Sequence, residues 1–259
     1  MSTARFPLAT GATAVLLSLT LTGAAAATVA VTLFASSAAA AAATVNLGTA
    51  APFAVLAGSA VTNTGPSVLR GDLGLSPGTA VTGFPPGTVL GTQHVADAVA
   101  LQAENDLVTA YNSAAGQTPR IDKTGQDLGG QTLVGGVYNA TAAMSLTGTL
   151  VLDAQGKSDT VFVFQAGSTL ITSSGSSVQL TGGAQPCNVY WQVGSSATLG
   201  TASRFVGTVM ALTSATLQTG ATLEGRVLAR NGAVTLDTNV INRPACAAAP
   251  PTPAPPTPA

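Results

Sequence analysis

Apolar and polar residues alternate along the second half of the chain, and the alternation recurs with a fixed period. Five positions recur eighteen residues later with the same character: Leu199 and Leu217, Phe205 and Leu223, Gly207 and Gly225, Val209 and Val227, and Ala211 and Ala229. A third copy begins at Gly232, and weaker copies start at Gly167 and Ala57. A period near 20 residues with glycines at fixed positions is typical of a solenoid that adds one coil per repeat.

The repeat also predicts which side chains face the core. Successive residues of a strand point to opposite sides. The pattern therefore predicts outward threonines and inward leucines, in the pairs Thr198–Leu199, Thr216–Leu217 and Thr235–Leu236. A single coil is too small to bury its apolar side, so stacking supplies the core. A β-sandwich of similar strands is the alternative, but it gives no reason for so regular a period.

One segment follows a different pattern. From Gln93 to Ala115, apolar residues recur every three or four positions, which predicts an amphipathic helix. Thr92 is suited to cap its start, and Gly116 to end it. The apolar stripe needs a partner, and the side of the solenoid is available. His94, the single histidine, invites a catalytic interpretation, but no nucleophile motif accompanies it, so a surface or packing role is expected.

The two ends of the chain differ from this body. Residues 1–43 contain one charge, Arg5, an apolar run and a series of alanines, which predicts a secretory signal peptide; a retained membrane anchor is the alternative. Residues 247–259 alternate Pro with Ala and Thr, which predicts a disordered spacer. The body, residues 44–246, is expected to be a single β-solenoid domain of an exported protein.

The composition argues against several classes of function. Charged residues make up only 7% of the chain and the formal net charge is −1, so neither nucleic acid nor an anionic membrane surface is an expected partner. Cys187 and Cys246 are the only cysteines, and in an oxidising compartment they are expected to form a disulfide. A zinc site is the alternative, but two cysteines and one histidine do not complete four ligands.

Catalytic constellations are missing from the sequence. It has no G-x-S-x-G, no H-E-x-x-H, no phosphate-binding loop and no calcium motif. The acidic residues are scattered, whereas a glycosidase needs two carboxylates facing one groove. We therefore expect no catalytic residue, no metal and no cofactor, and an enzyme acting on extracellular polysaccharide is the least favoured hypothesis.

Threonine and serine in register are the candidate functional residues. Stacked coils lie about 4.8 Å apart and alternate strand residues about 6.7 Å apart, so such side chains form a regular grid that can hold ordered water. A structural explanation is also open, because Thr is a good outward-facing strand residue. The predicted face comprises Thr64, Ser67, Ser174, Ser177, Thr198, Thr201, Thr216, Thr219, Thr222 and Thr235.

The body resembles a known family along nearly its whole length. The stretches that carry the resemblance include Phe53-Ala-Val-Leu-Ala-Gly-Ser, Gly71-Asp-Leu-Gly, Gly135-Gly-Val-Tyr, Val161-Phe-Val-Phe-Gln and Trp191-Gln-Val-Gly-Ser-Ser-Ala-Thr-Leu. They are similar to the bacterial and fungal ice-binding proteins. The resemblance implies an all-β, right-handed, discontinuous β-solenoid of roughly triangular cross-section with one long α-helix alongside. It implies that the N-terminal coil packs beside the C-terminal ones, and that ice is bound on one flat face.

Some members of that family carry a T-A/G-x-T/N motif on the binding face. Thr219-Gly-Ala-Thr222 matches it, whereas Thr201-Ala-Ser-Arg204 ends in a bulky cation. The favoured hypothesis is therefore a secreted or cell-surface monomer that adsorbs to ice or ordered water. The alternative is a structural or adhesive extracellular module on the same scaffold, with cell-surface or matrix polymers as partners. Neither hypothesis requires membrane insertion after signal cleavage.

Overall fold

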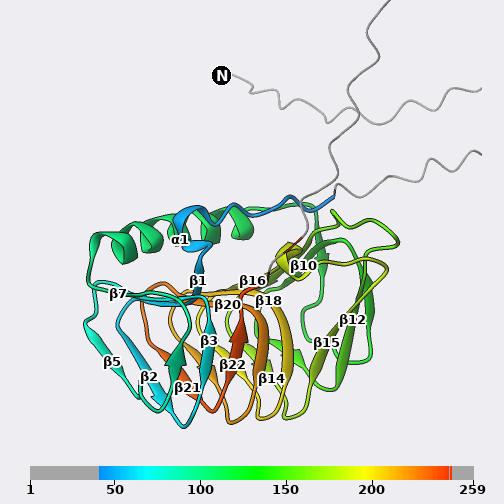
Figure 1. Cartoon of the computed structure of the whole chain (residues 1–259). Coiled ribbons are helices and arrows are strands. Elements are labelled where there is room, and N and C mark those ends of the chain that lie inside the picture. Colours follow the sequence, from blue (N-terminus) through cyan, green and yellow to red (C-terminus); the bar gives the residue numbers. More distant parts are fainter. Residues whose placement is uncertain (1–40, 245, 247–259) are drawn as a thin grey trace, which may run out of the picture. The chain divides into compact units, whose positions relative to one another are not determined.

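A computed structural model describes residues 41–244 and 246, and shows a right-handed β-solenoid built from parallel strands (Figure 1). The all-β solenoid fold predicted from the repeat is confirmed. Each coil contributes strand segments to three walls, two belonging to a fifteen-stranded sheet and one to a seven-stranded sheet. The predicted signal peptide, apart from residues 41–43, and the tail 247–259 lie outside the described residues.

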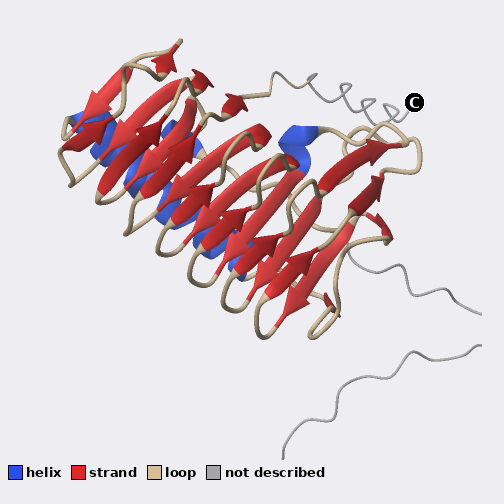
Figure 2. Ribbon diagram, turned by 90° about the horizontal axis from the view of Figure 1, so that it is seen from below, coloured by secondary structure: helices blue, strands red, loops and turns tan. Residues whose placement is uncertain are grey.

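The seven-stranded sheet forms the first wall. Its strands run in the spatial order β11 (Met144–Leu146), β14 (Leu170–Thr172), β17 (Ala197–Leu199), β19 (Ala215–Leu217), β21 (Val234–Asp237), β2 (Ala60–Thr64) and β5 (Ala80–Thr82). All pairs in it are parallel, and the strands lie side by side in Figure 2 with the helix behind them.

The fifteen-stranded sheet supplies the other two walls because its longest strands, β18 (Arg204–Ala211) and β20 (Thr222–Ala229), run through both. We call the wall on which helix α1 (Ala98–Ala115) packs the covered wall, and the other wall of this sheet the open wall. The covered wall contains β8 (Arg120–Asp122), β10 (Gly136–Ala140), β13 (Phe162–Ala166), β16 (Val189–Val193), the second halves of β18 and β20, β1 (Phe53–Ala57), β4 (Asp72–Leu75) and β7 (Gln93–Val95). The open wall contains β9 (Thr132–Val134), β12 (Thr149–Asp153), β15 (Ser177–Thr181), the first halves of β18 and β20, β22 (Val240–Asn242), β3 (Val68–Arg70) and β6 (Thr88–Val89).

The stacking order is discontinuous, as the family resemblance implies. Strands β1, β2 and β3 from the start of the body pair with β20, β21 and β22 from its end. The coil that contains β4, β5 and β6 then stacks on the outside of this N-terminal coil, and β7 in turn pairs with β4. The first and last coils of the body are therefore neighbours in the middle of the stack.

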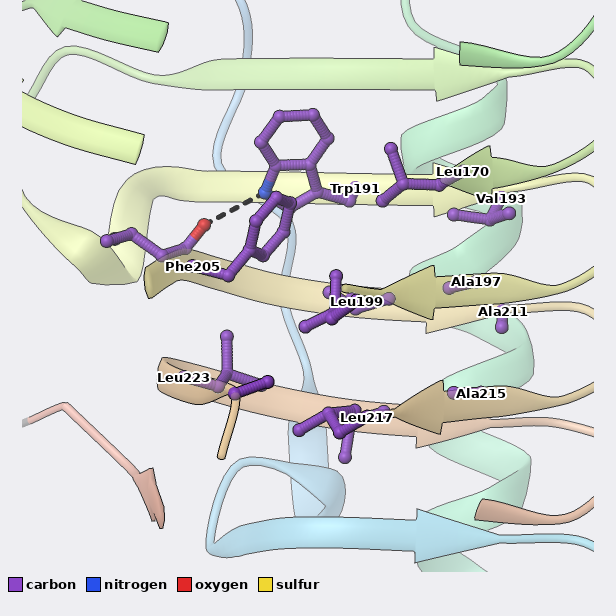
Figure 3. Close-up of a cluster of buried hydrophobic side chains, with 14 of the residues drawn as sticks. Leu170, Trp191, Val193, Ala197, Leu199, Phe205, Ala211, Ala215, Leu217 and Leu223 are labelled. Carbon is purple, nitrogen blue, oxygen red and sulfur yellow. Dashed lines mark hydrogen bonds between the residues drawn. The ribbon is translucent and has the colours of Figure 1, made fainter. Parts of the chain in front are cut away.

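The eighteen-residue repeat is confirmed position by position. Leu199 pairs with Leu217, and all of β18 pairs in register with β20. Their inward side chains fill the core beside Trp191 (Figure 3). Trp191 also belongs to an aromatic stack, in which the Phe164 and Trp191 ring centroids lie 3.9 Å apart. The Trp191 indole N–H donates to the Val206 carbonyl at 2.9 Å, which satisfies the one polar atom of that side chain.

The glycines of the repeat lie where the long strands turn from one wall to the next. Gly207 has a φ of 109°, which L side chains rarely adopt. A Cβ on Gly225 would overlap the Gly207 carbonyl of the neighbouring coil. The fixed position of glycine in the repeat therefore follows from close backbone contact at this turn.

The helix is shorter than the sequence predicts. Helix α1 spans Ala98–Ala115, and Gln93–Val95 forms strand β7 instead of its first turn. The N-cap is Asp97, whose carboxylate accepts from the Ala100 amide at 2.8 Å, and not Thr92. The physical reason is that the segment before Asp97 gains backbone hydrogen bonds by pairing with the edge of β4. The C-terminal end at Gly116 is confirmed.

Helix α1 packs on the covered wall, as predicted from its apolar stripe. Leu107, Ala110 and Ala114 are fully buried against residues of the sheet. The Gln165 amide donates to the Ala114 carbonyl at 2.8 Å, which adds a hydrogen bond to a backbone acceptor at the helix C-terminus. His94 bonds to the N-cap Asp97 at 2.8 Å, so its observed role is to support the start of the helix.

One acidic side chain is buried between the helix and the covered wall. Glu104 is 8% exposed, and neither carboxylate oxygen has a hydrogen-bond partner among the described residues. Burial raises the pKa of Glu104 to about 8, although the positive charge of Arg230 acts in the opposite direction. Arg230 itself lies over the Tyr111 ring, 4.9 Å from its centroid. The upward shift of the pKa therefore favours the protonated, uncharged form of the Glu104 carboxyl at neutral pH.

The predicted disulfide between Cys187 and Cys246 is present. Cys187 lies in the short 3-10 helix η2 (Pro186–Asn188), just before β16. The other short helix, η1 (Gly48–Ala50), precedes β1. The disulfide therefore fixes the chain that follows β22 to a coil several layers away. Closing a loop of 59 residues stabilises a protein by about 4 kcal/mol in the chain-entropy picture.

Candidate functional site

A continuous row of threonines runs across the outer surface of the seven-stranded sheet. Strand pairing places these residues next to one another in neighbouring coils. We call this row the threonine ladder, and its members are Thr198, Thr216, Thr235, Thr62 and Thr82. Each side chain lies at the middle of a short strand or near its end, between residues that point into the solenoid.

The strand geometry determines the spacing of the ladder. Neighbouring parallel strands lie about 4.8 Å apart, so methyl and hydroxyl groups repeat at that interval across five coils. The hydroxyl of Thr62 donates to the hydroxyl of Thr235 at 3.3 Å, which shows how closely two members approach. Because threonine is β-branched, its χ1 angle is restricted and the row is held in a regular orientation.

Small side chains flank the ladder on one side. The residue two positions before each ladder threonine also reaches the outer surface, and backbone hydrogen bonds and strand pairing keep these residues in register. They are Ser196, Ser214, Ala233, Ala60 and Ala80. None is larger than serine, so the surface beside the ladder is even. The two rows together form a grid of small groups without an ionisable side chain.

The structure divides the ten predicted site residues among different surfaces. Thr198, Thr216 and Thr235 belong to the ladder, and Thr64 lies at the end of the same sheet, paired with Asp237. Ser174, Thr201 and Thr219 lie in the turns that follow the strands. Ser177 and Thr222 lie on the open wall, in one row with Arg204. The ten residues therefore do not form a single flat face.

Ser67 has to be removed from the predicted face. Its side chain is 0% exposed, and its hydroxyl accepts a hydrogen bond from the Asn239 amide at 2.9 Å. The hydroxyl satisfies a backbone donor at the turn into the last coil, where no water reaches it. Matching the T-A/G-x-T/N spacing could not reveal this inward orientation.

The turn residues that match the motif have hydroxyls with partners inside the protein. Thr219 donates to a carboxylate oxygen of Asp237 at 2.5 Å, and Thr201 donates to the Gln218 side chain at 3.4 Å. Both threonines are exposed, but they follow the corner where the chain leaves the seven-stranded sheet. The motif thus runs from the turn onto the open wall and does not lie on the wall of the ladder.

Two ladder residues, Thr62 and Thr82, were missed by the sequence prediction. A signal was present, because the tripeptide Ala-Val-Thr occurs at positions 60–62, 80–82 and 233–235. The structure pairs all three copies in adjacent strands. The eighteen-residue period hides them, because these copies are neighbours through the discontinuous stacking and not through consecutive repeats.

The comparisons with known proteins agree with this architecture. A family profile described as "Ice-binding-like" matches residues 55–242. An ice-binding protein of Nostoc sp. is 55% identical over 197 residues, which cover 76% of this chain and 73% of that protein.

The chain belongs to the ice-binding-like family.

Two solved structures of ice-binding proteins share the fold. One, from an Antarctic biological consortium, is 50% identical with a TM-score of 0.76, and the match covers 78% of this chain and 91% of that one. The other, from the Antarctic ascomycete Antarctomyces psychrotrophicus, is 43% identical with a TM-score of 0.77, covering 79% and 100%. The relatives of this ice-binding-like chain are thus named for binding ice and not for catalysis.

Three further observations bear on this family member. Across the described residues, no helix combines the length and hydropathy that a membrane span requires. Within the same part of the chain, no three His, Cys, Asp or Glu side chains gather as metal ligands would. Asp237 ends β21, two positions after the ladder residue Thr235, and Asp127 lies beyond the ladder, beside Ser145 of β11.

Proposed function

We propose that this protein binds ice through the threonine ladder and the row of small residues beside it. The observation that carries the proposal is the pairing of Thr198, Thr216, Thr235, Thr62 and Thr82 in consecutive coils, beside a row of small side chains without charge. Such a surface offers methyl and hydroxyl groups at a repeating interval, so water molecules over it are held in a repeating pattern that can join an ice lattice. Membership of the ice-binding-like family supports the same conclusion.

Binding at this surface requires no chemistry beyond adsorption. Each hydroxyl contributes little by itself, because hydrogen bonds exchanged with water are worth only about 1 kcal/mol. Five coils acting together make adsorption persistent, since all contacts must break before the protein leaves the surface. The protein acts in this proposal as a monomeric adsorbent without a catalytic role, and the apolar N-terminal segment 1–43 directs its export.

Observation of ice growth tests the proposed function. The purified full chain is added to a single ice crystal near its melting point, and crystal shape and thermal hysteresis are measured against protein concentration. Faceted growth and a hysteresis that rises with concentration are expected. Round crystals that grow freely at all concentrations contradict ice binding, and in that case an adhesive role on extracellular polymers becomes the favoured function.

Export is tested separately. Expression of the full chain in a secreting bacterial host should release a protein that lacks the N-terminal segment, as N-terminal sequencing shows. A protein retained in the membrane with Met1 intact would instead support an anchor.

A further inference from the structure

The hydroxyl row of the seven-stranded sheet stops at one residue. Beyond Thr198, the next position in the register is Ile171, and the one after it is Ser145. Ile171 is 49% exposed, although it is one of the large apolar side chains of the described residues. Its neighbours in the strand, Leu170 and Thr172, are both buried. Ile171 therefore faces solvent at the position that threonine occupies in the following five coils.

Isoleucine differs from threonine at this position in a defined way. Both side chains are β-branched and carry a methyl group on Cβ, so the restriction of χ1 is the same. Isoleucine replaces the hydroxyl with an ethyl group, which is longer and has neither a donor nor an acceptor. Ile171 therefore interrupts the grid in two respects, by the missing hydroxyl and by the extra length above the surface.

The coil beyond Ile171 does not resume the ladder. The Ser145 hydroxyl donates to a carboxylate oxygen of Asp127 at 2.8 Å. The other carboxylate oxygen of Asp127 accepts from the Gly129 and Thr147 amides, at 2.7 and 2.9 Å. The Ser145 hydroxyl therefore has a charged hydrogen-bond partner, and backbone amides of the turn hold that carboxylate in place. At this edge of the sheet, the position beside Ser145 is therefore taken by the carboxylate of Asp127, and no free hydroxyl continues the row.

We propose that Ile171 sets the boundary of the ice-contacting surface, a proposal that rests on the proposed function. The contact extends over the five coils from Thr198 to Thr82, and the coils of β14 and β11 lie outside it. The size of the bound area, and with it the strength of adsorption, is then limited by one exposed side chain and not by the length of the solenoid.

Substitution of Ile171 tests this boundary directly. Ile171→Thr adds a sixth hydroxyl in register, so ice affinity is expected to rise about two- to tenfold, the contribution of one further hydrogen bond. Ile171→Val is the matched control, because it shortens the side chain without adding a hydroxyl. Wild-type activity is measured first, and melting temperatures confirm that both variants fold.

The outcomes separate the two proposals. A gain in Ile171→Thr alone supports a boundary set by the missing hydroxyl, and a gain in both variants supports a boundary set by the ethyl group. No gain in either, with active wild-type protein, overturns the boundary and leaves the proposed function intact. Inactive wild-type protein defeats the proposed function, and this proposal with it.

A second pair of variants places a bulky ring on each side of the boundary. Thr198→Tyr lies inside the proposed contact and is expected to abolish crystal shaping. Ser145→Tyr lies outside and is expected to retain the wild-type hysteresis at a temperature where melting curves show the variant folded, since only the Asp127 hydrogen bond is lost. Loss of hysteresis in folded Ser145→Tyr would show that ice contact continues past Ile171, which overturns the proposal.

Discussion

Two walls of this solenoid face outward without a helix over them, and they have the same backbone spacing but different side chains. On the seven-stranded sheet, five consecutive coils present threonine at one position. On the open wall, the corresponding row mixes hydroxyl, aliphatic and cationic side chains, in the order Thr149, Ser177, Arg204, Thr222, Val240, Val68 and Thr88. The fold supplies a periodic array on both walls.

The difference shows that periodicity alone does not make a recognition surface. Every solenoid wall repeats its side chains at the strand spacing because the backbone hydrogen bonds impose it. A lattice is matched only where the repeated side chains also share one size, one rotamer and one set of polar atoms. On the open wall, Arg204 breaks all three conditions and the valines lack the polar atoms, whereas the ladder meets all three over five coils.

The largest effect is expected when a bulky ring is placed in the middle of the ladder. Thr216→Tyr lifts an aromatic ring above the grid and keeps the neighbouring hydroxyls from contacting ice together. Thermal hysteresis should fall close to that of buffer. Tyrosine suits an outward strand position, and surface substitutions cost within about 0.5 kcal/mol, so the melting temperature should not change.

Thr222→Tyr is the matched control on the open wall. It carries the same change on the next wall of the same coil, and it should keep wild-type hysteresis. If Thr222→Tyr lost activity while Thr216→Tyr kept it, the ice-contacting surface would be the open wall and the comparison would be reversed.

The next effect concerns stability and involves the covered wall alone. Glu104 has a pKa of about 8 in the folded protein and about 4.5 when unfolded. Between about pH 4.5 and about pH 8, the folded protein keeps a proton on Glu104 that the unfolded chain has released. The contribution of this group to the free energy of unfolding is therefore greatest below about pH 4.5, and it is lost as the pH rises to about 8. The total loss is on the order of 5 kcal/mol, at about 1.36 kcal/mol for each pKa unit.

Denaturant unfolding at a series of pH values measures this loss. Glu104→Gln keeps the shape of the side chain without an ionisable proton, so it should remove most of the decrease between pH 5 and pH 8. Thermal hysteresis of the wild type should stay constant over the same range, because the ladder contains no titratable group. Equal pH dependence in Glu104→Gln and wild type would show that another group is responsible.

The sequence predicted those parts of the fold that depend on a local repeat. The pairing of Leu199 with Leu217 and of Gly207 with Gly225 follows directly from the eighteen-residue period. Inward leucines and outward threonines followed from the alternation of a strand. The amphipathic stripe placed α1 on the solenoid, because Leu107 and Ala114 needed apolar partners.

The errors arose where long-range pairing decides the structure. Gln93–Val95 forms a strand because the edge of β4 is available for pairing, and the sequence of that tripeptide does not indicate which strand it pairs with. Ser67 points inward because the last coil needs an acceptor for the Asn239 amide. Thr62 and Thr82 join the ladder through discontinuous stacking, which sequence periodicity does not record. Site residues on different coils can be assigned to one wall only after the register is known.

A smaller effect is expected when a single hydroxyl is removed without a change of shape. Thr62 donates to Thr235 within the ladder, and valine has the same β-branched outline. Thr62→Val should therefore lower ice affinity about two- to tenfold, the value of roughly one hydrogen bond, as measured by binding of labelled protein to ice. Thr222→Val on the open wall should have no effect. Unchanged affinity in both variants would mean that the methyl groups, and not the hydroxyls, carry recognition.

The smallest effect is expected for Arg204→Thr, although the family motif makes this substitution the most attractive one. Arg204 occupies the last position of Thr201-Ala-Ser-Arg204, and threonine there completes the motif. The structure places this side chain on the open wall, exposed, between Ser177 and Thr222. The substitution therefore creates a row of four hydroxyls, from Thr149 to Thr222, in a different plane from the ladder, where it adds nothing to a contact that spans five coils. Hysteresis equal to wild type at low and at high salt is the expected result, since removal of an exposed cation away from the contact leaves adsorption unchanged. A clear gain in hysteresis would show that ice contact continues around the corner onto the open wall, and that the two walls act as one surface.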